Sequence, residues 1–180
     1  KLLGVAKNTE DGIEVKVHPM LIPNNHPLAN VNDAFNAVFV HGKAMDDAMF
    51  MGRGAGQMPT ASAVVGDIID VCRNIVHDSC GRIGCCCYKN LEVKDITDTK
   101  SKFFLRLEVA DKQGVLANIA SVLGNSGVSI AQVVQKSGKD GVAELVIITA
   151  EVLEKNFNDA MAVFKGLSAV KNIAGVIRVY

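Results

Sequence analysis

The sequence predicts an α+β protein in which a partial mixed sheet with a long helix is followed by a second, more regular domain. Three observations lead to this prediction. Short segments alternate apolar and polar side chains at the period of strands, and apolar residues recur at helical spacing between Ala61 and Val76. The order strand, helix, strand, strand, helix, strand can be read within residues 102–180. Hydrophobic residues fill 49% of the 180 positions, which is enough to build a core.

Strands are expected in the first half wherever short runs are alternating or wholly apolar. Ile13–Val17 alternates apolar and charged side chains, and His18-Pro19 is expected to end that strand. The runs 37–40 and 48–51 have strand length, with a turn predicted at 43–47. These strands lead into the long amphipathic helix.

The chain is expected to divide into three consecutive parts. Residues 1–78 form the strand-and-helix region, and residues 79–101, which follow neither period, form a linker that contains cysteines. Residues 102–180 form the second domain. Its predicted elements are strands at 103–109, 128–134, 142–149 and 170–179, the last broken near Gly175, and helices at 115–123 and 153–165. This order is the split βαβ arrangement of a ferredoxin-like βαββαβ domain.

Charge and cysteine content limit the function classes. Basic and acidic residues both number 19, so the chain has no basic excess for nucleic acid or anionic lipid, and neither is expected as a partner. No apolar run reaches the length of a spanning helix, and the first residues given lack the charged-then-apolar layout of a signal peptide, so neither is expected. Five cysteines, three of them consecutive, do not suit a disulfide framework, so we expect a cytoplasmic protein with reduced thiols. Because it starts at Lys1, we expect the chain to be part of a longer protein.

A glycine-rich segment, Gly52-Arg53-Gly54-Ala55-Gly56, lies between a predicted strand and the long helix. Small residues there allow close approach of a ligand to the backbone, and helix N–H groups can face an anion. The segment matches a dinucleotide fingerprint only loosely, because Gln57 stands at the last glycine position and Asp67 and Asp70 fall inside the helix. From the residues alone, a tight turn without a ligand stays an open alternative.

The cysteines and histidines do not form a convincing catalytic or metal site. Cys80, Cys85 and Cys87 have a loose spacing without a second CxxC pair, so no metal is expected and the alternative is buried or linker thiols. The histidines at 18, 26 and 41 lie in loops or at strand ends and have no evident partner. No common catalytic motif occurs, so no catalytic residue is assigned.

The segment Asp111–Gly114 lies where a predicted strand leads into a helix. Gly114 permits close backbone approach, the N–H groups of residues 115–117 can bind a carboxylate, and Asp111 can bind an ammonium group. This combination suits a free amino acid. The alternative is structural, with Asp111 as an N-cap and Gly114 as a turn residue.

Two groups of motifs resemble known families. Leu107–Leu116 (LEVADKQGVL) with Gly127–Ile130 (GVSI) is similar to an ACT domain, a small ligand-binding module that regulates amino-acid enzymes. Segments of the first half resemble the end of the catalytic region of homoserine dehydrogenase: HPMLIP from His18, HPLA from His26, FNAV from Phe35 and GRGAG from Gly52 through Thr60-Ala61. Together the resemblances cover nearly the whole chain.

The resemblance implies an NAD(P)-dependent enzyme that interconverts homoserine and aspartate semialdehyde, on the route to threonine and methionine. The nucleotide-binding domain and catalytic residues would precede Lys1, so these 180 residues are expected to bind no cofactor by themselves and to be inactive. The resemblance places contacts with the cofactor of the parent enzyme at Gly52, Gly54, Ala55 and Gly56. Arg53 departs from the proline often found there.

The resemblance also implies regulation by a free amino acid, typically threonine. It assigns the effector to Asp111, Gln113, Gly114 and Val115, with Asn118 and Gln132 as weaker candidates. A homo-oligomer, dimer or tetramer, is expected through an unpaired edge strand, either 103–109 or 128–134. The alternatives are a stand-alone amino-acid-binding module, an ACT-containing part of another dehydrogenase, and a thiol or metal protein.

Overall fold

The computed structural model describes residues 1–81, 84, 90–136, 138 and 140–180. They form two compact units, one made of residues 1–22 and 91–180 and the other of residues 23–90. The first unit therefore joins the start of the chain to its second half. The expected division into residues 1–78, 79–101 and 102–180 stays a prediction. The two compact units divide the chain at other positions, after residues 22 and 90.

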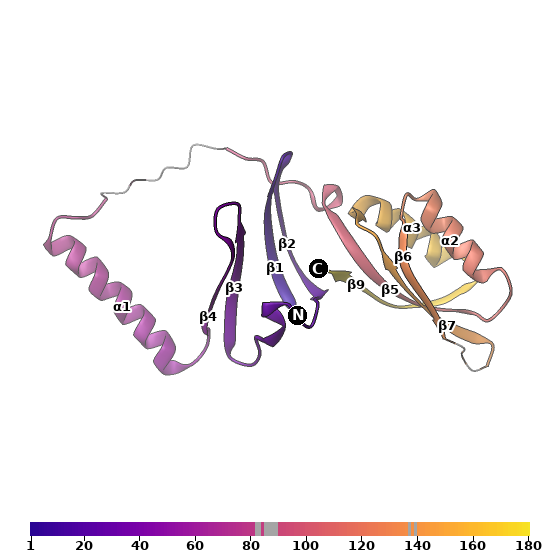
Figure 1. The fold of residues 1–180 in the computed structure, drawn as a ribbon, viewed down its shortest axis with the longest axis horizontal. Coiled ribbons are helices and arrows are strands. Elements are labelled where there is room, and N and C mark those ends of the chain that lie inside the picture. Colours follow the sequence, from indigo (N-terminus) through magenta and orange to yellow (C-terminus); the bar gives the residue numbers. More distant parts are fainter. Residues whose placement is uncertain (82–83, 85–89, 137, 139) are drawn as a thin grey trace. The chain divides into compact units, whose positions relative to one another are not determined.

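The first unit is built on one mixed sheet with the strand order β1-β2-β9-β5-β7-β6 (Figure 1). Neighbouring strands are antiparallel except β2 and β9, which run parallel. The strands are β1 Leu2–Thr9, β2 Gly12–Leu21, β5 Lys100–Ala110, β6 Ile130–Lys136, β7 Val142–Thr149, the short β8 Val152–Leu153 and β9 Val170–Val179. The helices are the 3-10 turn η2 Ile96–Asp98, α2 Val115–Asn125 and α3 Glu154–Gly166. Strand, helix, strand, strand, helix, strand is the predicted order, and the α+β prediction is confirmed.

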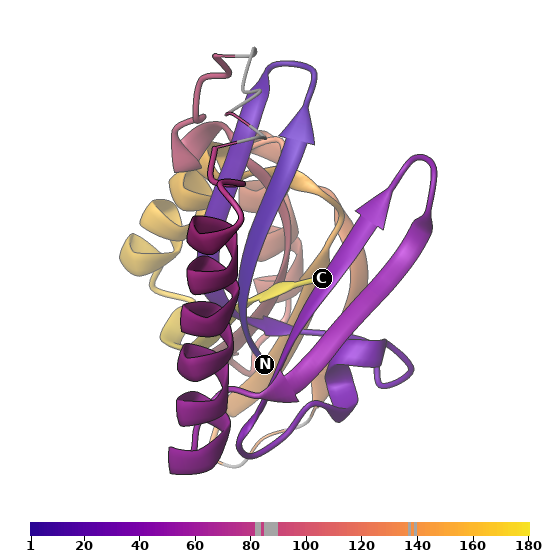
Figure 2. The same cartoon turned by 90° about the vertical axis from the view of Figure 1, so that its left-hand side faces the viewer.

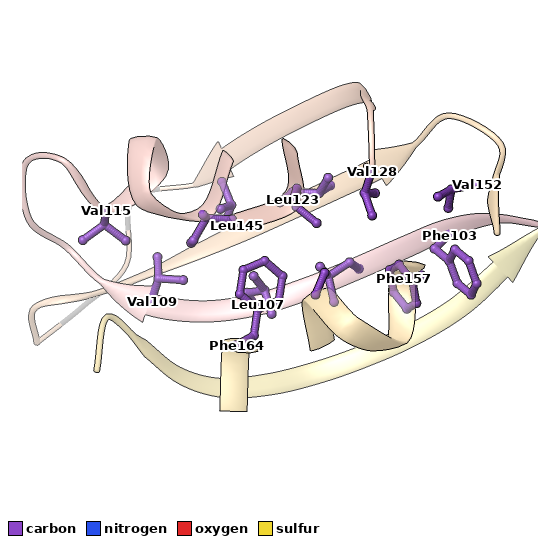
Figure 3. Close-up of a cluster of buried hydrophobic side chains, with 14 of the residues drawn as sticks. Phe103, Leu107, Val109, Val115, Leu123, Val128, Leu145, Val152, Phe157 and Phe164 are labelled. Carbon is purple, nitrogen blue, oxygen red and sulfur yellow. The ribbon is translucent and has the colours of Figure 1, made fainter. Parts of the chain in front are cut away.

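The core of this unit lies between one face of the sheet and the two helices (Figure 3). Every second residue of β5, from Phe103 to Val109, is buried, as the alternating pattern predicts. Ile119 of α2 and Phe164 of α3 are fully buried against them. The ring of Phe103 stacks on that of Phe157 with centroids 3.6 Å apart. Both helices thus cover the same face of the sheet.

The second unit contains η1 Pro27–Asn30, β3 Phe35–Gly42, β4 Asp46–Arg53 and the long helix α1 Gln57–Val76. β3 and β4 form an antiparallel hairpin, and Figure 2 shows α1 as a straight helix after it. Every residue of α1 is at least partly exposed. None of the helices in the described part of the chain is long and apolar enough to cross a membrane.

Four local features differ from the sequence prediction. β1 was not predicted, and β2 continues through His18-Pro19 to Leu21. Met20 and the N-terminal Lys1 donate backbone hydrogen bonds to each other and so form a hydrogen-bonded pair. The next pair along the antiparallel ladder, Leu2 and Pro19, is therefore a non-hydrogen-bonded pair, in which the missing N–H of Pro19 is not needed. β5 begins at Lys100, inside the predicted linker. The predicted break in the last strand is a register shift beside Gly175 within one continuous strand.

Candidate functional site

The loop between β5 and α2 borders a pocket of about 320 Å³. This Asp111 pocket is lined by Val109, Ala110, Asp111, Lys112, Gln113, Gly114, Val115, Leu116, Gln135 and Leu145. Its volume is at the lower end of the range for small-molecule sites, which suits a ligand of amino-acid size. Asp111 and Lys112 place one acidic and one basic side chain at its rim, and both are exposed.

The backbone of α2 begins at this pocket with unused hydrogen-bond donors. Gly114 is the N-cap, with a left-handed φ of 84°, and no side chain caps the helix. Val115 N–H donates to Lys112 O at 3.4 Å, and Asn118 N–H donates to Gly114 O at 3.0 Å. The N–H groups of Leu116 and Ala117, which lie between them, have no backbone partner among the described residues, so the helix start can receive a carboxylate.

The structural alternative for Asp111 is wrong in one respect. The N-cap of α2 is Gly114, and the carboxylate of Asp111 has no hydrogen bond or ion pair with any described residue. The backbone of Asp111 is held in place, since its N–H donates to Gly141 O at 2.9 Å. Gly114 does have the positive φ of a turn residue. The Asp111 side chain is thus free to contact a ligand.

The pocket contains four of the six residues predicted for the effector. Asp111, Gln113, Gly114 and Val115 line it, whereas Asn118 and Gln132 do not. Gln135 of β6 lines it instead and was not predicted. Strand alternation distinguishes the two glutamines, since residues three apart in a strand lie on opposite faces. Gln135 pairs with Leu145, a buried residue of β7, and therefore faces the core side of the sheet where α2 lies.

The glycine-rich segment connects β4 to α1 in the second unit and borders an open groove of about 800 Å³. Its lining residues are Gly54, Ala55, Gly56, Gln57, Thr60, Ala61, Val64 and Val65. Gly52 belongs to β4, where it pairs with Asn36, and does not line the groove. The N-cap of α1 is Gly56, with φ 126°, so the requirement for glycine conformational freedom lies there.

Gly54 is needed for a different reason than Gly56. Its N–H donates to Ala34 O at 3.0 Å, and a Cβ at this position would overlap the side-chain amide of Asn36. The neighbouring Arg53 lies over the ring of Phe35, 5.1 Å from its centroid. Three of the four residues predicted to contact the cofactor, Gly54, Ala55 and Gly56, thus lie together in the groove at the start of a long helix.

The predicted metal alternative depends mainly on residues that the structure does not describe. Cys85, Cys86 and Cys87 lie outside the described residues, while Cys72 and Cys80 are exposed free thiols. Within the described ranges, no group of three His, Cys, Asp or Glu side chains could hold a metal.

Two histidines have identifiable local contacts. The ring of His26 accepts a hydrogen bond from Leu28 N–H at 3.2 Å and caps η1. His41 contacts Asp47 at 2.7 Å on the exposed hairpin. Both contacts are local, between residues two and six positions apart in the sequence.

Comparison with known proteins assigns both halves of the chain. Residues 1–69 match the model of the homoserine dehydrogenase family, and residues 97–178 match that of the ACT domain. The chain matches the C-terminal portion of homoserine dehydrogenases. Its first region corresponds to the end of the catalytic domain of these enzymes, and its second region is the ACT domain. The predicted family resemblance is confirmed.

Homoserine dehydrogenases of known sequence and structure align with almost the whole chain. The enzyme of Pseudomonas aeruginosa is 38% identical over 99% of this chain, and that of Corynebacterium glutamicum is 40% identical over 96%. A crystal structure of homoserine dehydrogenase from Thiobacillus denitrificans superposes with a TM-score of 0.88 at 38% identity, covering this whole chain and 42% of that one. The chain spans 43% and 38% of the two curated relatives, so it corresponds to less than half of such an enzyme.

Proposed function

We propose that the chain supplies the amino-acid-sensing part of a homoserine dehydrogenase and that threonine binds in the Asp111 pocket. The parent enzyme interconverts homoserine and aspartate semialdehyde with NAD(P). The observation that carries the proposal is the start of α2, which no side chain of a described residue caps and which opens into a pocket beside the carboxylate of Asp111, itself unbound by any described residue.

The charges of a free amino acid match those of the pocket. The ligand carboxylate is placed at the N–H groups of Leu116 and Ala117, where the helix dipole favours a negative charge. The ligand ammonium is placed at Asp111, with which it forms a charge-assisted hydrogen bond. Gln113 and Gln135 offer amide groups to the side-chain hydroxyl that distinguishes threonine from glycine or alanine.

Thermal unfolding with added amino acids tests the proposal. A ligand that binds only the folded state at 100 times its dissociation constant adds about 2.7 kcal/mol of stability, which is a Tm increase of about 10 °C in a unit of this size. We expect threonine to produce this shift and Asp111→Asn, which keeps the size of the side chain, to reduce it strongly. Asp159→Asn, an exposed change in α3, is the matched control. A shift by threonine no larger than that by glycine would contradict threonine as the effector.

We infer that the groove at Gly54, Ala55 and Gly56 faces the nicotinamide cofactor in the parent enzyme. Members of the family use NAD(P), and the start of α1 offers backbone N–H groups next to small residues. Gly52, predicted as a fourth contact, supports the loop from β4. The chain carries no dinucleotide fingerprint for the adenosine half, so these 180 residues alone are expected to be inactive. Homoserine oxidation by the purified 180-residue chain would contradict this expectation.

A homo-oligomer, dimer or tetramer, is also proposed. β6 is an edge strand of the sheet, with Val133 and Val134 both more than 40% exposed, and edge strands readily pair with a second copy. The predicted alternative, pairing through 103–109, is wrong because β5 lies between β9 and β7 inside the sheet.

A further inference from the structure

Strand β2 lies in the part of the chain assigned to the catalytic region, yet its backbone is bound to the second half at both ends. At its start, Ile13 N–H donates to Glu92 O at 2.9 Å, and Lys94 N–H donates to Ile13 O at 2.9 Å. At its end, β2 pairs in parallel with β9, and Tyr180 N–H donates to Leu21 O at 2.9 Å. The β1–β2 hairpin is therefore a continuation of the ACT sheet (Figure 1).

Between these two ends, a buried lysine of β2 reaches the first residues of β5. The ammonium group of Lys16 donates to Lys100 O and to Ser101 Oγ, both at 3.0 Å. Its side chain is 3% exposed, and the carboxylate of Glu14 lies 3.8 Å away. Glu14 is in turn 3.7 Å from the ammonium group of Lys94, so the charge of this carboxylate is shared between two lysines.

The contacts of Lys16 continue into α3 and β9. The Ser101 hydroxyl helps to lower the pKa of Glu154, the first residue of α3. Glu154 is 3% exposed on its side chain and accepts two hydrogen bonds from Arg178 of β9, each 2.6 Å long. Lys16, Ser101, Glu154 and Arg178, here named the Lys16 cluster, thus bring polar and charged side chains of β2, β5, α3 and β9 together.

A cluster of this kind is better suited to fixing one arrangement than to adding stability. Burial lowers the pKa of Lys16, although Glu14 and Glu154 oppose this effect, so keeping its charge costs free energy. Buried ion pairs can often be replaced by apolar residues without loss of stability, whereas removing one partner is costly. The hydrogen-bonding requirements of the cluster oblige β2 to sit in one position against β5 and β9.

β5 carries the Lys16 cluster and the Asp111 pocket at opposite ends. Ser101 lies near the start of the strand and Val109 near its end, about 27 Å apart for eight residues of strand. Beyond Leu21, β2 leads directly into residues 23–90, which contain the glycine-rich segment. Strand β5 therefore borders the Asp111 pocket at one end. At its other end it is bound by Lys16 of β2, the strand that leads into residues 23–90.

We propose that the Lys16 cluster is the joint that makes the β1–β2 hairpin one cooperative unit with the ACT domain and transmits the occupancy of the Asp111 pocket to the catalytic region. The first part of this proposal needs no ligand, and the second part rests on the proposed function. If the hairpin and the ACT domain form one cooperative unit, their amides should open together, which hydrogen exchange can measure.

Hydrogen exchange on the 180-residue chain tests the first part. Ile119→Val, a small cavity in the ACT core, is expected to lower amide protection about fivefold in β5 and β7, and equally in β2. In a Lys16→Met background, β2 should exchange faster and should no longer respond to Ile119→Val. Lys7→Met, the same change at an exposed position of β1, is the matched control and should leave the response intact. If Lys16→Met does not fold, Ser101→Ala takes its place.

Two outcomes would contradict the first part of the proposal, that the Lys16 cluster makes the β1–β2 hairpin and the ACT domain one cooperative unit. One is a β2 strand that does not respond to Ile119→Val in the wild-type chain, and the other is a β2 strand that responds equally in the Lys16→Met background. Threonine tests the second part: it should raise β2 protection in the wild-type chain and leave it unchanged in Lys16→Met, with the same affinity measured by calorimetry. Equal responses of β2 to bound threonine in both chains would overturn transmission through the cluster. If no amino acid binds to the wild-type chain, the proposed function and the transmission both fail. The response to Ile119→Val still tests whether the β1–β2 hairpin and the ACT domain form one cooperative unit.

Discussion

Glu154 is a buried carboxylate whose charge is stabilised chiefly by Arg178. Burial alone would raise the pKa of Glu154, but hydrogen bonds from Arg178 and Ser101 and the charges of Arg178 and Lys16 lower it below its usual value of 4.5. A carboxyl group with a lowered pKa contributes stability above pH 4.5, and this contribution is lost as the pH falls through the folded-state pKa. The ion pair therefore stabilises the unit at neutral pH and not in acid.

Arg178→Met tests this dependence. At pH 7 the change removes the charge of Arg178 and its two hydrogen bonds from the buried Glu154, and we expect it to lower the free energy of unfolding by about 3 kcal/mol. The deficit should shrink as the pH falls from 7 to 4, because burial without Arg178 raises the pKa of Glu154 and the carboxyl group becomes neutral in the variant. Urea unfolding across this pH range measures both. Lys171→Met, at an exposed position of the same strand, is the control, and a deficit independent of pH would contradict the role of Glu154.

At the scale of elements, periodicity identified most of the second half and less of the first. The strand at 142–149 and the helix beginning at Val115 have the predicted positions, because each buries one face against the same core. β1 has no clean alternation, since it lies at the sheet edge and much of it is exposed. The passage of β2 through Pro19 depends on its ladder position relative to β1, which local sequence does not contain.

The junction of β3, β4 and α1 offers a prediction about why glycine stands at position 54. Because a Cβ there meets the amide of Asn36, Gly54→Ala should destabilise the junction by about 2 kcal/mol, a typical cost of overpacking. Asn36→Ala should restore most of this loss when the two are combined, while Gly52→Ala, which meets open space, should cost less. Hydrogen exchange of the β3 and β4 amides measures the local effect. No rescue by Asn36→Ala would show that Gly54 is required for another reason.

For the molecule as a whole, sequence located the candidate sites more easily than it described their surroundings. Loop chemistry at Asp111 and Gly114 is local, so the pocket could be predicted from consecutive residues. Gln135 follows Gly114 by 21 residues. It lines the pocket because β6 pairs with β7, and the sequence does not specify this pairing. The Lys16 cluster was also missed, because its members lie on four elements and one of them is more than 160 residues from Lys16.

Assembly through β6 is the prediction that concerns the whole molecule. If two copies pair antiparallel along this edge about a two-fold axis, Val134 of one copy lies close to Val134 of its partner. Val134→Lys then brings two ammonium groups together and should shift the chain from dimer to monomer in sedimentation velocity runs at several concentrations. Val163→Lys, at a valine of α3 that is 50% exposed compared with 41% for Val134, should leave the dimer intact, since that helix lies on the face of the sheet and not at its edge. A wild-type chain that stays monomeric at high concentration, or equal dissociation by both lysines, would rule out pairing through β6.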